Sequence, residues 1–214
     1  MKYAKVLALA AVVAGAFMAF IGAGTASATV LCSTTVEPCP AGQKVTTELD
    51  FSVPSGGALN LVDTSGNSLD KCTGSTVEGK ITNSGSATET VTGELTTPLS
   101  TTGLTWTGCT FETKTTSASG KLEIHKIAGT SNGTVTSDSK FEVEIKNIPI
   151  IGTCTYGVEA GTSIGDLTEG NPAVFHANAV AVKFGPNALC PSTSRWTGTY
   201  NLTSPATTVS VGAS

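Results

Sequence analysis

Apolar and polar side chains alternate one by one along three stretches of this chain. The stretches are residues 45–53 (VTTELDFSV), 120–127 (GKLEIHKI) and 140–148 (KFEVEIKNI). In the first of them, one face carries Val45, Thr47, Leu49, Phe51 and Val53. Because successive side chains of a β-strand point to opposite faces, each stretch is expected to form a strand with one face in water.

Weaker strand patterns fill most of the remaining chain. Turn-forming clusters such as Pro54-Ser55-Gly56-Gly57 and Ser131-Asn132-Gly133 separate many of them. Charged residues make up only 13% of the chain, which favours strands over helices, and the alternation is too regular for a disordered chain. The sequence therefore predicts an all-β fold, an antiparallel β-sandwich or a barrel-like fold of about ten short strands. The weaker strands are expected at residues 58–63, 75–82, 88–95, 103–111, 173–184, 196–202 and 206–212.

Residues 1–28 have the layout of a cleaved signal peptide. A short segment with Lys2 and Lys5 precedes an apolar run at 6–21, and Ala26-Ser27-Ala28 suits a signal peptidase. An uncleaved anchor is the alternative, but the run is shorter than the roughly 20 residues that a spanning helix needs. We expect residues 29–214 to form a single all-β domain that is secreted or associated with the cell envelope, with no membrane span after cleavage.

Six cysteines are expected to form three structural disulfides. A lipid anchor on Cys32 is disfavoured because the bulky Leu31 precedes it, and the spacing lacks the Cys-x2-Cys pairs of zinc sites. No Cys-x-x-Cys motif suggests redox catalysis. Six cysteines allow fifteen pairings, but an even number in an exported chain points to disulfides. Sequence order and similar loop lengths favour the pairs Cys32–Cys39, Cys72–Cys109 and Cys154–Cys190.

A weak internal duplication is a second possibility within the domain. It would relate the region around 72–111, which begins CTGSTVEG, to the region around 154–200, which begins CTYGVEAG. The order of Trp and Cys differs between the two copies, and chance matches are common in a chain rich in Thr and Gly.

The charge of the chain disfavours nucleic acid as a partner. Removing the two lysines of the signal peptide from the twelve basic residues leaves ten against sixteen acidic ones, a net charge of −6. No basic run or patch is present to neutralise phosphates.

The sequence offers little from which to build a catalytic site. His125 lies on the polar face of a predicted strand, and His176 lies near Asn178, but neither belongs to a known catalytic motif. Carboxylates such as Asp50, Glu142 and Glu144 fall on faces that are typical of solvent exposure. We therefore expect no enzyme activity and no cofactor.

Two further groups of residues are candidate binding sites. Asp63, Ser65, Asn67 and Asp70 faintly resemble a calcium loop but lack its acidic density, so a hydrogen-bonded turn without metal is expected. Four aromatic residues could form a ligand-facing patch, although aromatic side chains on alternating strands usually fill a core. These candidates are Trp106, Trp196, Tyr156 and Tyr200.

The signal sequence, the segments LCSTTVEPCP and ALCPSTSRWTGTY and the Thr-rich strands together resemble uncharacterised secreted or cell-envelope proteins of high-GC Gram-positive bacteria. The acidic, disulfide-bonded all-β character is also similar to secreted apoproteins that sequester chromophores. Neither resemblance assigns a functional residue.

The function favoured by the sequence is an exported, non-catalytic protein with a structural, adhesive or surface-binding role. Its partner is unknown, a cell-surface glycan or an envelope protein being the expected kinds. A secreted carrier of a small apolar or carbohydrate ligand is the first alternative, and a secreted hydrolase is the second. A deep pocket lined by Trp and Tyr would favour the carrier.

Overall fold

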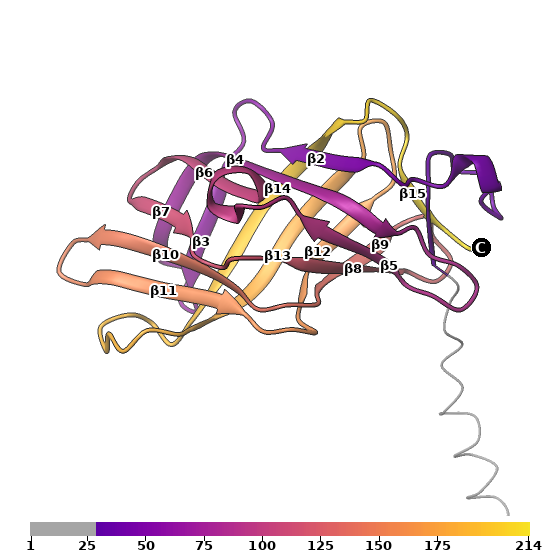
Figure 1. Cartoon of the computed structure of the whole chain (residues 1–214). Coiled ribbons are helices and arrows are strands. Elements are labelled where there is room, and N and C mark those ends of the chain that lie inside the picture. The colour runs from indigo at the N-terminus through magenta and orange to yellow at the C-terminus, as the bar shows by residue number, and fades with distance from the viewer. Residues whose placement is uncertain (1–28) are drawn as a thin grey trace, which may run out of the picture.

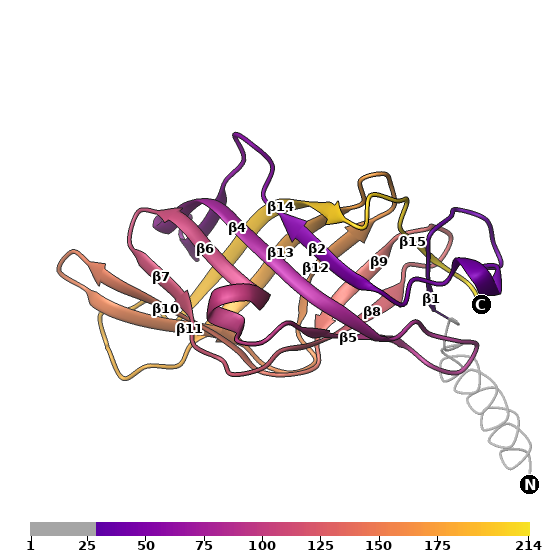
Figure 2. The ribbon, with the colours of Figure 1, turned by 45° about the horizontal axis from the view of Figure 1, so that its top comes forward.

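Eight antiparallel strands close into a barrel (Figures 1 and 2). The computed structural model describes residues 29–214, so the expected signal peptide at 1–28 lies outside the described residues. Each barrel strand pairs with the next, and the last pairs with the first. The all-β prediction is therefore confirmed, in its barrel form. In order around the barrel, the strands are β2 (Glu48–Ser52), β4 (Ser68–Asn83), β5 (Val91–Leu95), β8 (Lys121–Lys126), β9 (Gly133–Ser137), β12 (Ser163–Thr168), β13 (Val174–Lys183) and β14 (Thr193–Ser204).

Three of these strands, β4, β13 and β14, continue past the barrel and carry five outer strands, which we call the extension (Figure 1). On one side β3 (Leu59–Asp63) lies between β14 and β4, and β6 (Leu104–Cys109) pairs with the opposite edge of β4. On the other side β11 (Gly152–Val158) pairs with the end of β13, followed by β10 (Phe141–Ile148) and β7 (Glu112–Thr115). Trp106 Nε1 donates to Thr115 Oγ1 at 3.0 Å, so side chains join β6 to β7.

A small two-stranded sheet closes the barrel end that lies away from the extension (Figure 2). It pairs β1 (Val30–Cys32) with β15 (Ser210–Gly212), and every residue of both strands is buried. We call this sheet and the loop closed by Cys32–Cys39 the end cap. Its Val211 packs on the barrel wall, where a Cβ added to Gly133 would lie 2.9 Å from a Val211 methyl. An ion pair between Glu37 and Lys126 also ties the cap to the barrel.

Helical structure is limited to two short turns in the described part of the chain. These are the 3-10 turn η1 (Ala41–Gln43) and the π turn η2 (Leu99–Gly103). Neither is long or apolar enough to cross a membrane, and residues 29–214 contain no other helix.

The three strongest strand predictions are confirmed as β2, β8 and β10, and their inward residues, including Phe51, Ile124 and Ile145, are buried. The expected number of about ten short strands is wrong. Residues 29–214 contain fifteen strands, and β4 alone spans 16 residues. Strands such as β9 and β12 were missed because their inward positions include glycines. At Gly165 a Cβ would lie 2.1 Å from the His176 carbonyl oxygen, so the position has no room for a side chain and the alternating pattern is lost.

All three disulfides have the predicted pairing. Cys72–Cys109 joins β4 to β6, and Cys154–Cys190 joins β11 to the loop that follows β13. No cysteine in residues 29–214 is free. Disulfides persist in oxidising compartments, so three of them indicate an extracytoplasmic location. The faint internal duplication stays a prediction.

Candidate functional site

An apolar cavity of about 150 Å³ lies inside the molecule, where the barrel meets the extension. Barrel residues such as Phe51 and Val135 line it together with extension residues such as Leu61 and Ile145. Most of its lining side chains are apolar and buried, and the polar ones are Asn60, Asp70, Lys80, Glu94 and Thr113. Ligand sites are usually concave, apolar and largely preformed, so this cavity is the leading candidate for a functional site.

The cavity exists because several inward positions carry small residues. Gly79 and Gly93 lie on the adjacent strands β4 and β5, and Ala179 and Ala181 lie on β13. At the two glycines the backbone of the neighbouring strand lies close, since an added Cβ would be 3.0 Å from the Glu94 carbonyl oxygen at Gly79 and 3.3 Å from the Lys80 carbonyl oxygen at Gly93. At Ala179 and Ala181 larger side chains would occupy the space, so the small residues of β13 leave part of the interior unfilled.

Three of the four aromatic residues singled out from the sequence line this cavity. They are Trp106 of β6, Trp196 of β14 and Tyr156 of β11. The rings of Trp106 and Trp196 are 5.3 Å apart and tilted by 57°. Strands from both sides of the extension therefore bring these rings to a shared site.

The fourth aromatic residue, Tyr200, belongs to the core only. Its ring meets Trp196 edge-on at 6.2 Å, but Tyr200 itself does not line the cavity. Its buried hydroxyl donates to Ser75 Oγ at 3.1 Å. All four aromatic residues therefore lie in the hydrophobic core or pack against it, and three of them also line the cavity. A ligand-facing role for them stays a prediction.

Burial changes the chemistry of two tyrosines. Desolvation, helped by the negative charge of Asp63, raises the pKa of Tyr156 to about 12. Desolvation also raises the pKa of Tyr200, against the opposing effect of its hydrogen bond with Ser75. Both hydroxyls therefore stay protonated at neutral pH and can donate hydrogen bonds.

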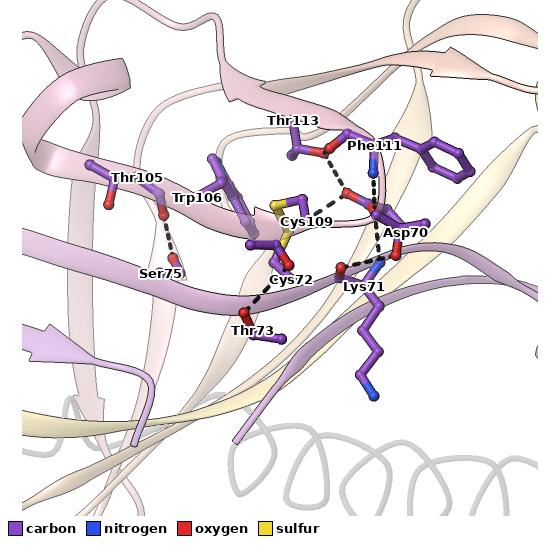
Figure 3. Close-up of a disulfide and its surroundings, with 12 residues drawn as sticks. Asp70, Lys71, Cys72, Thr73, Ser75, Thr105, Trp106, Cys109, Phe111 and Thr113 are labelled. Atoms are coloured by element: carbon purple, nitrogen blue, oxygen red, sulfur yellow. Dashed lines mark hydrogen bonds between the residues drawn. A yellow bond between two sulfur atoms is a disulfide. The ribbon is translucent and has the colours of Figure 1, made fainter. Parts of the chain in front are cut away.

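Asp70 is a buried carboxylate beside the Cys72–Cys109 disulfide (Figure 3). Its Oδ1 accepts the backbone N–H groups of Lys71 at 2.8 Å and Phe111 at 3.1 Å, and its Oδ2 accepts the Thr113 hydroxyl. These bonds offset the cost of burying the charge and tie β4 to the β6–β7 turn. Sequence reasoning placed Asp70 in a loop, because its partners are about 40 residues away in the chain.

The same cluster does not form a metal site in its oxidised state. Ligand atoms of Asp70, Cys72 and Cys109 lie within 4.8 Å of one another. However, the sulfurs are bonded to each other, and thiolates rather than disulfides bind metals. Asp70 Oδ2 and Cys72 Sγ are 3.6 Å apart, but a disulfide sulfur has no proton to donate, so this is only a contact. The cluster is structural.

The loop at residues 63–67, which faintly resembles a calcium loop in sequence, forms a hydrogen-bonded turn. Asp63 accepts the backbone N–H groups of Ser65 and Asn67, both at 2.8 Å, and the Asn67 side-chain amide at 2.8 Å. These hydrogen bonds, led by the Asn67 amide, lower the pKa of Asp63. Asp70 is buried in β4 and does not join them.

The two histidines lie on the outer face of the barrel, away from the cavity. His125 Nε2 is 3.2 Å from a Glu123 carboxylate oxygen and 3.3 Å from Thr136 Oγ1. A catalytic relay uses one ring nitrogen for the carboxylate and the other for the hydroxyl, whereas here a single nitrogen faces both. The His125 side chain is also 45% exposed, and His176 is exposed on β13. Neither histidine reaches the cavity lining.

Comparison with known proteins gives no relative for this chain: no protein-family model matches it, and no curated protein or solved structure is significantly similar to it. The function must therefore be inferred from the cavity and its lining.

Proposed function

We propose that this protein is an exported binding protein that holds a small apolar ligand in the cavity between the barrel and the extension. The observation that carries the proposal is an interior space of about 150 Å³ lined by Trp106, Trp196 and Tyr156. A pocket of this kind is the feature that separates a carrier from a purely structural protein. The structural or adhesive role favoured by the sequence stays a prediction, as does the absence of enzyme activity.

The size of the cavity limits the ligand. Apolar cavities of about 150 Å³ stay free of water and accept benzene or xenon. One ring or a short branched chain of roughly six to eight non-hydrogen atoms is therefore the class of ligand that fits without rearrangement. This volume excludes a large chromophore or an oligosaccharide from the cavity as it stands.

The energetic cost of an empty interior also supports a ligand. Cavities lower stability by about 24 cal/mol per Å³, which for this volume is on the order of 3–4 kcal/mol. Protein interiors are usually packed as densely as organic crystals. A ligand that fills the space would recover part of this stability.

The proposed location is outside the cytoplasm. Three disulfides support it, and so does the signal-peptide pattern of residues 1–28. Secretion and a high-GC Gram-positive bacterial source remain part of the proposal. Intact-mass analysis of exported protein tests the cleavage: a chain that begins at Thr29 without lipid is expected, and a retained residue 1 would contradict it.

Thermal unfolding of residues 29–214 with added benzene tests the binding function. At a benzene concentration of 100 times Kd, binding adds about 2.7 kcal/mol, or roughly 5–11 °C in Tm for a domain of this size. Val135→Phe should abolish this shift because it fills the cavity. Val180→Phe is the matched control, since Val180 is 47% exposed on the outer face of β13. Equal shifts in both variants, or none in the unmodified protein, would overturn the proposal.

A further inference from the structure

Ile150 is the most exposed large apolar residue in the described part of the chain, with 98% of its surface open to solvent. It lies in the turn between β10 and β11, and this hairpin projects from the extension (Figures 1 and 2). The neighbouring isoleucines face the protein instead, since Ile148 is buried and Ile151 is half-buried. The turn is therefore anchored by two isoleucines and presents the third to its surroundings.

The backbone at Ile150 adopts a conformation that isoleucine disfavours. Its φ is 69°, in the left-handed region, where a β-branched residue is an outlier. A turn position with positive φ that follows a proline, here Pro149, usually carries Gly or Asn. Ile150 thus neither fills the core nor suits its backbone, so stability does not explain it. Strained positions of this kind cluster at functional sites.

A second apolar loop is held against this turn. Asn187, in the loop between β13 and β14, donates from Nδ2 to the carbonyl oxygens of Ile151 at 2.7 Å and Thr153 at 3.1 Å. The Cys154–Cys190 disulfide also joins this loop to β11, and its Leu189 is 61% exposed. We call the exposed apolar residues of the two loops the apolar tip: Pro149, Ile150, Pro186, Ala188 and Leu189.

The charge and size of the apolar tip indicate its partner. Residues 147–158 and 184–194 contain no charged residue, so moving the tip into an apolar medium desolvates no charge. Behind the tip on β10, Lys146 is already paired with Glu112 at 3.2 Å and Glu144 at 3.5 Å. The five residues of the tip are few beside the roughly 20–30 that each partner contributes to a stable protein interface. A lipid bilayer, in contrast, can accept a few projecting side chains.

We infer that the apolar tip inserts into the surface of an uncharged lipid bilayer and holds the protein there reversibly. An uncharged surface is specified because the net charge of −6 on residues 29–214 would be repelled by anionic lipids. The binding is weak, since even a single myristoyl chain gives only marginal attachment. This inference goes beyond the proposed function and does not depend on it, because no residue of the apolar tip lines the cavity.

Co-sedimentation of residues 29–214 with phosphatidylcholine vesicles at millimolar lipid tests the inference. Ile150→Asn should lower the partition coefficient by roughly 10- to 100-fold, the effect of no longer burying one isoleucine side chain. Asn adopts the left-handed conformation readily, so the same variant should keep Tm or raise it by up to about 8 °C. Loss of vesicle binding would then occur without loss of stability.

Val36→Asn is the matched control, because Val36 is 58% exposed in the end cap, away from the extension. It should leave the partition coefficient unchanged, whereas Leu189→Asn, on the second loop, should lower it. Equal partition of Ile150→Asn and the unmodified protein, or no binding of the unmodified protein, would overturn this inference. Self-association without vesicles that Ile150→Asn abolishes would also overturn it, in favour of a second copy of the chain. The shift of Tm with benzene tests the proposed function separately and should be the same in Ile150→Asn.

Discussion

Adding one methylene group at two buried valines should have opposite effects on stability. Val135 of β9 lines the cavity, whereas Val91 of β5 is fully buried and does not. Both pair with Ile124 of β8, one from each side, so they lie in the same layer of the barrel. Val→Ile is the same chemical change at both positions, which makes the two variants a matched pair.

The expected magnitudes follow from the space around each side chain. At Val135 the new methylene enters the cavity and is buried without displacing a neighbour, which stabilises the fold by about 0.8 kcal/mol at most. Val91 has no such room, since even a Cβ added to Gly85 would lie 3.0 Å from a Val91 methyl. Overpacking a filled core costs about 1–3 kcal/mol.

Urea or thermal denaturation of the two variants beside the unmodified protein measures the difference. For a domain of this size, 1 kcal/mol corresponds to about 2–4 °C in Tm. Val135→Ile should raise Tm by up to about 3 °C, and Val91→Ile should lower it by about 2–12 °C. Equal changes in the two variants would refute the reasoning, because they would mean that no free volume lies beside Val135.

Two further predictions concern the disulfides and the end cap. Removing Cys72–Cys109, with a sequence separation of 37, should cost about 4 kcal/mol on the chain-entropy model, whereas removing Cys32–Cys39, with a separation of 7, should cost about 2 kcal/mol. Denaturation of the two Cys→Ser double variants measures this, and a larger loss for the shorter loop would contradict it. The hydrogen bond from Lys126 lowers the pKa of Glu37 below its usual 4.5 in the folded protein. The Glu37–Lys126 pair therefore stabilises the folded protein fully above pH 4.5, and this stabilisation is lost as pH falls through the lowered pKa of Glu37. Glu37→Gln should therefore destabilise the protein at pH 7 and have little effect well below that pKa. Burial raises the pKa of Asp50, so ionisation of Asp50 lowers the stability of the folded protein as pH rises through the same range. The stability of Glu37→Gln must therefore be compared with that of the unmodified protein at each pH.

The sequence predicts the class of fold because alternation is local. In β10 each inward residue has a polar neighbour on either side, so the strand can be recognised without knowing its partners. In β9 the inward residues are Gly133, Val135 and Ser137, and the first of these is small because Val211 of the end cap packs there. Such a strand is defined by contacts with distant segments, and no local pattern reveals it.

The candidate site was only partly predictable for the same reason. Trp106, Trp196 and Tyr156 stand out as rare aromatic residues, but their meeting at one cavity depends on strand pairing across the extension. The cavity itself is lined by residues on strands far apart in the chain, such as Gly93 of β5 and Ala179 of β13. A glycine or an alanine in a strand pattern does not indicate whether a neighbour fills the space beside it.

Xenon binding in crystals of residues 29–214 tests the central claim most directly, since xenon occupies apolar cavities of this size and needs no polar partner. We predict one strong xenon site in the apolar cavity between the barrel and the extension, which is lost in Val135→Phe and kept in Val180→Phe. An interior without xenon, with side chains filling the space between the barrel and the extension, would contradict the proposal that this protein is built around a ligand cavity.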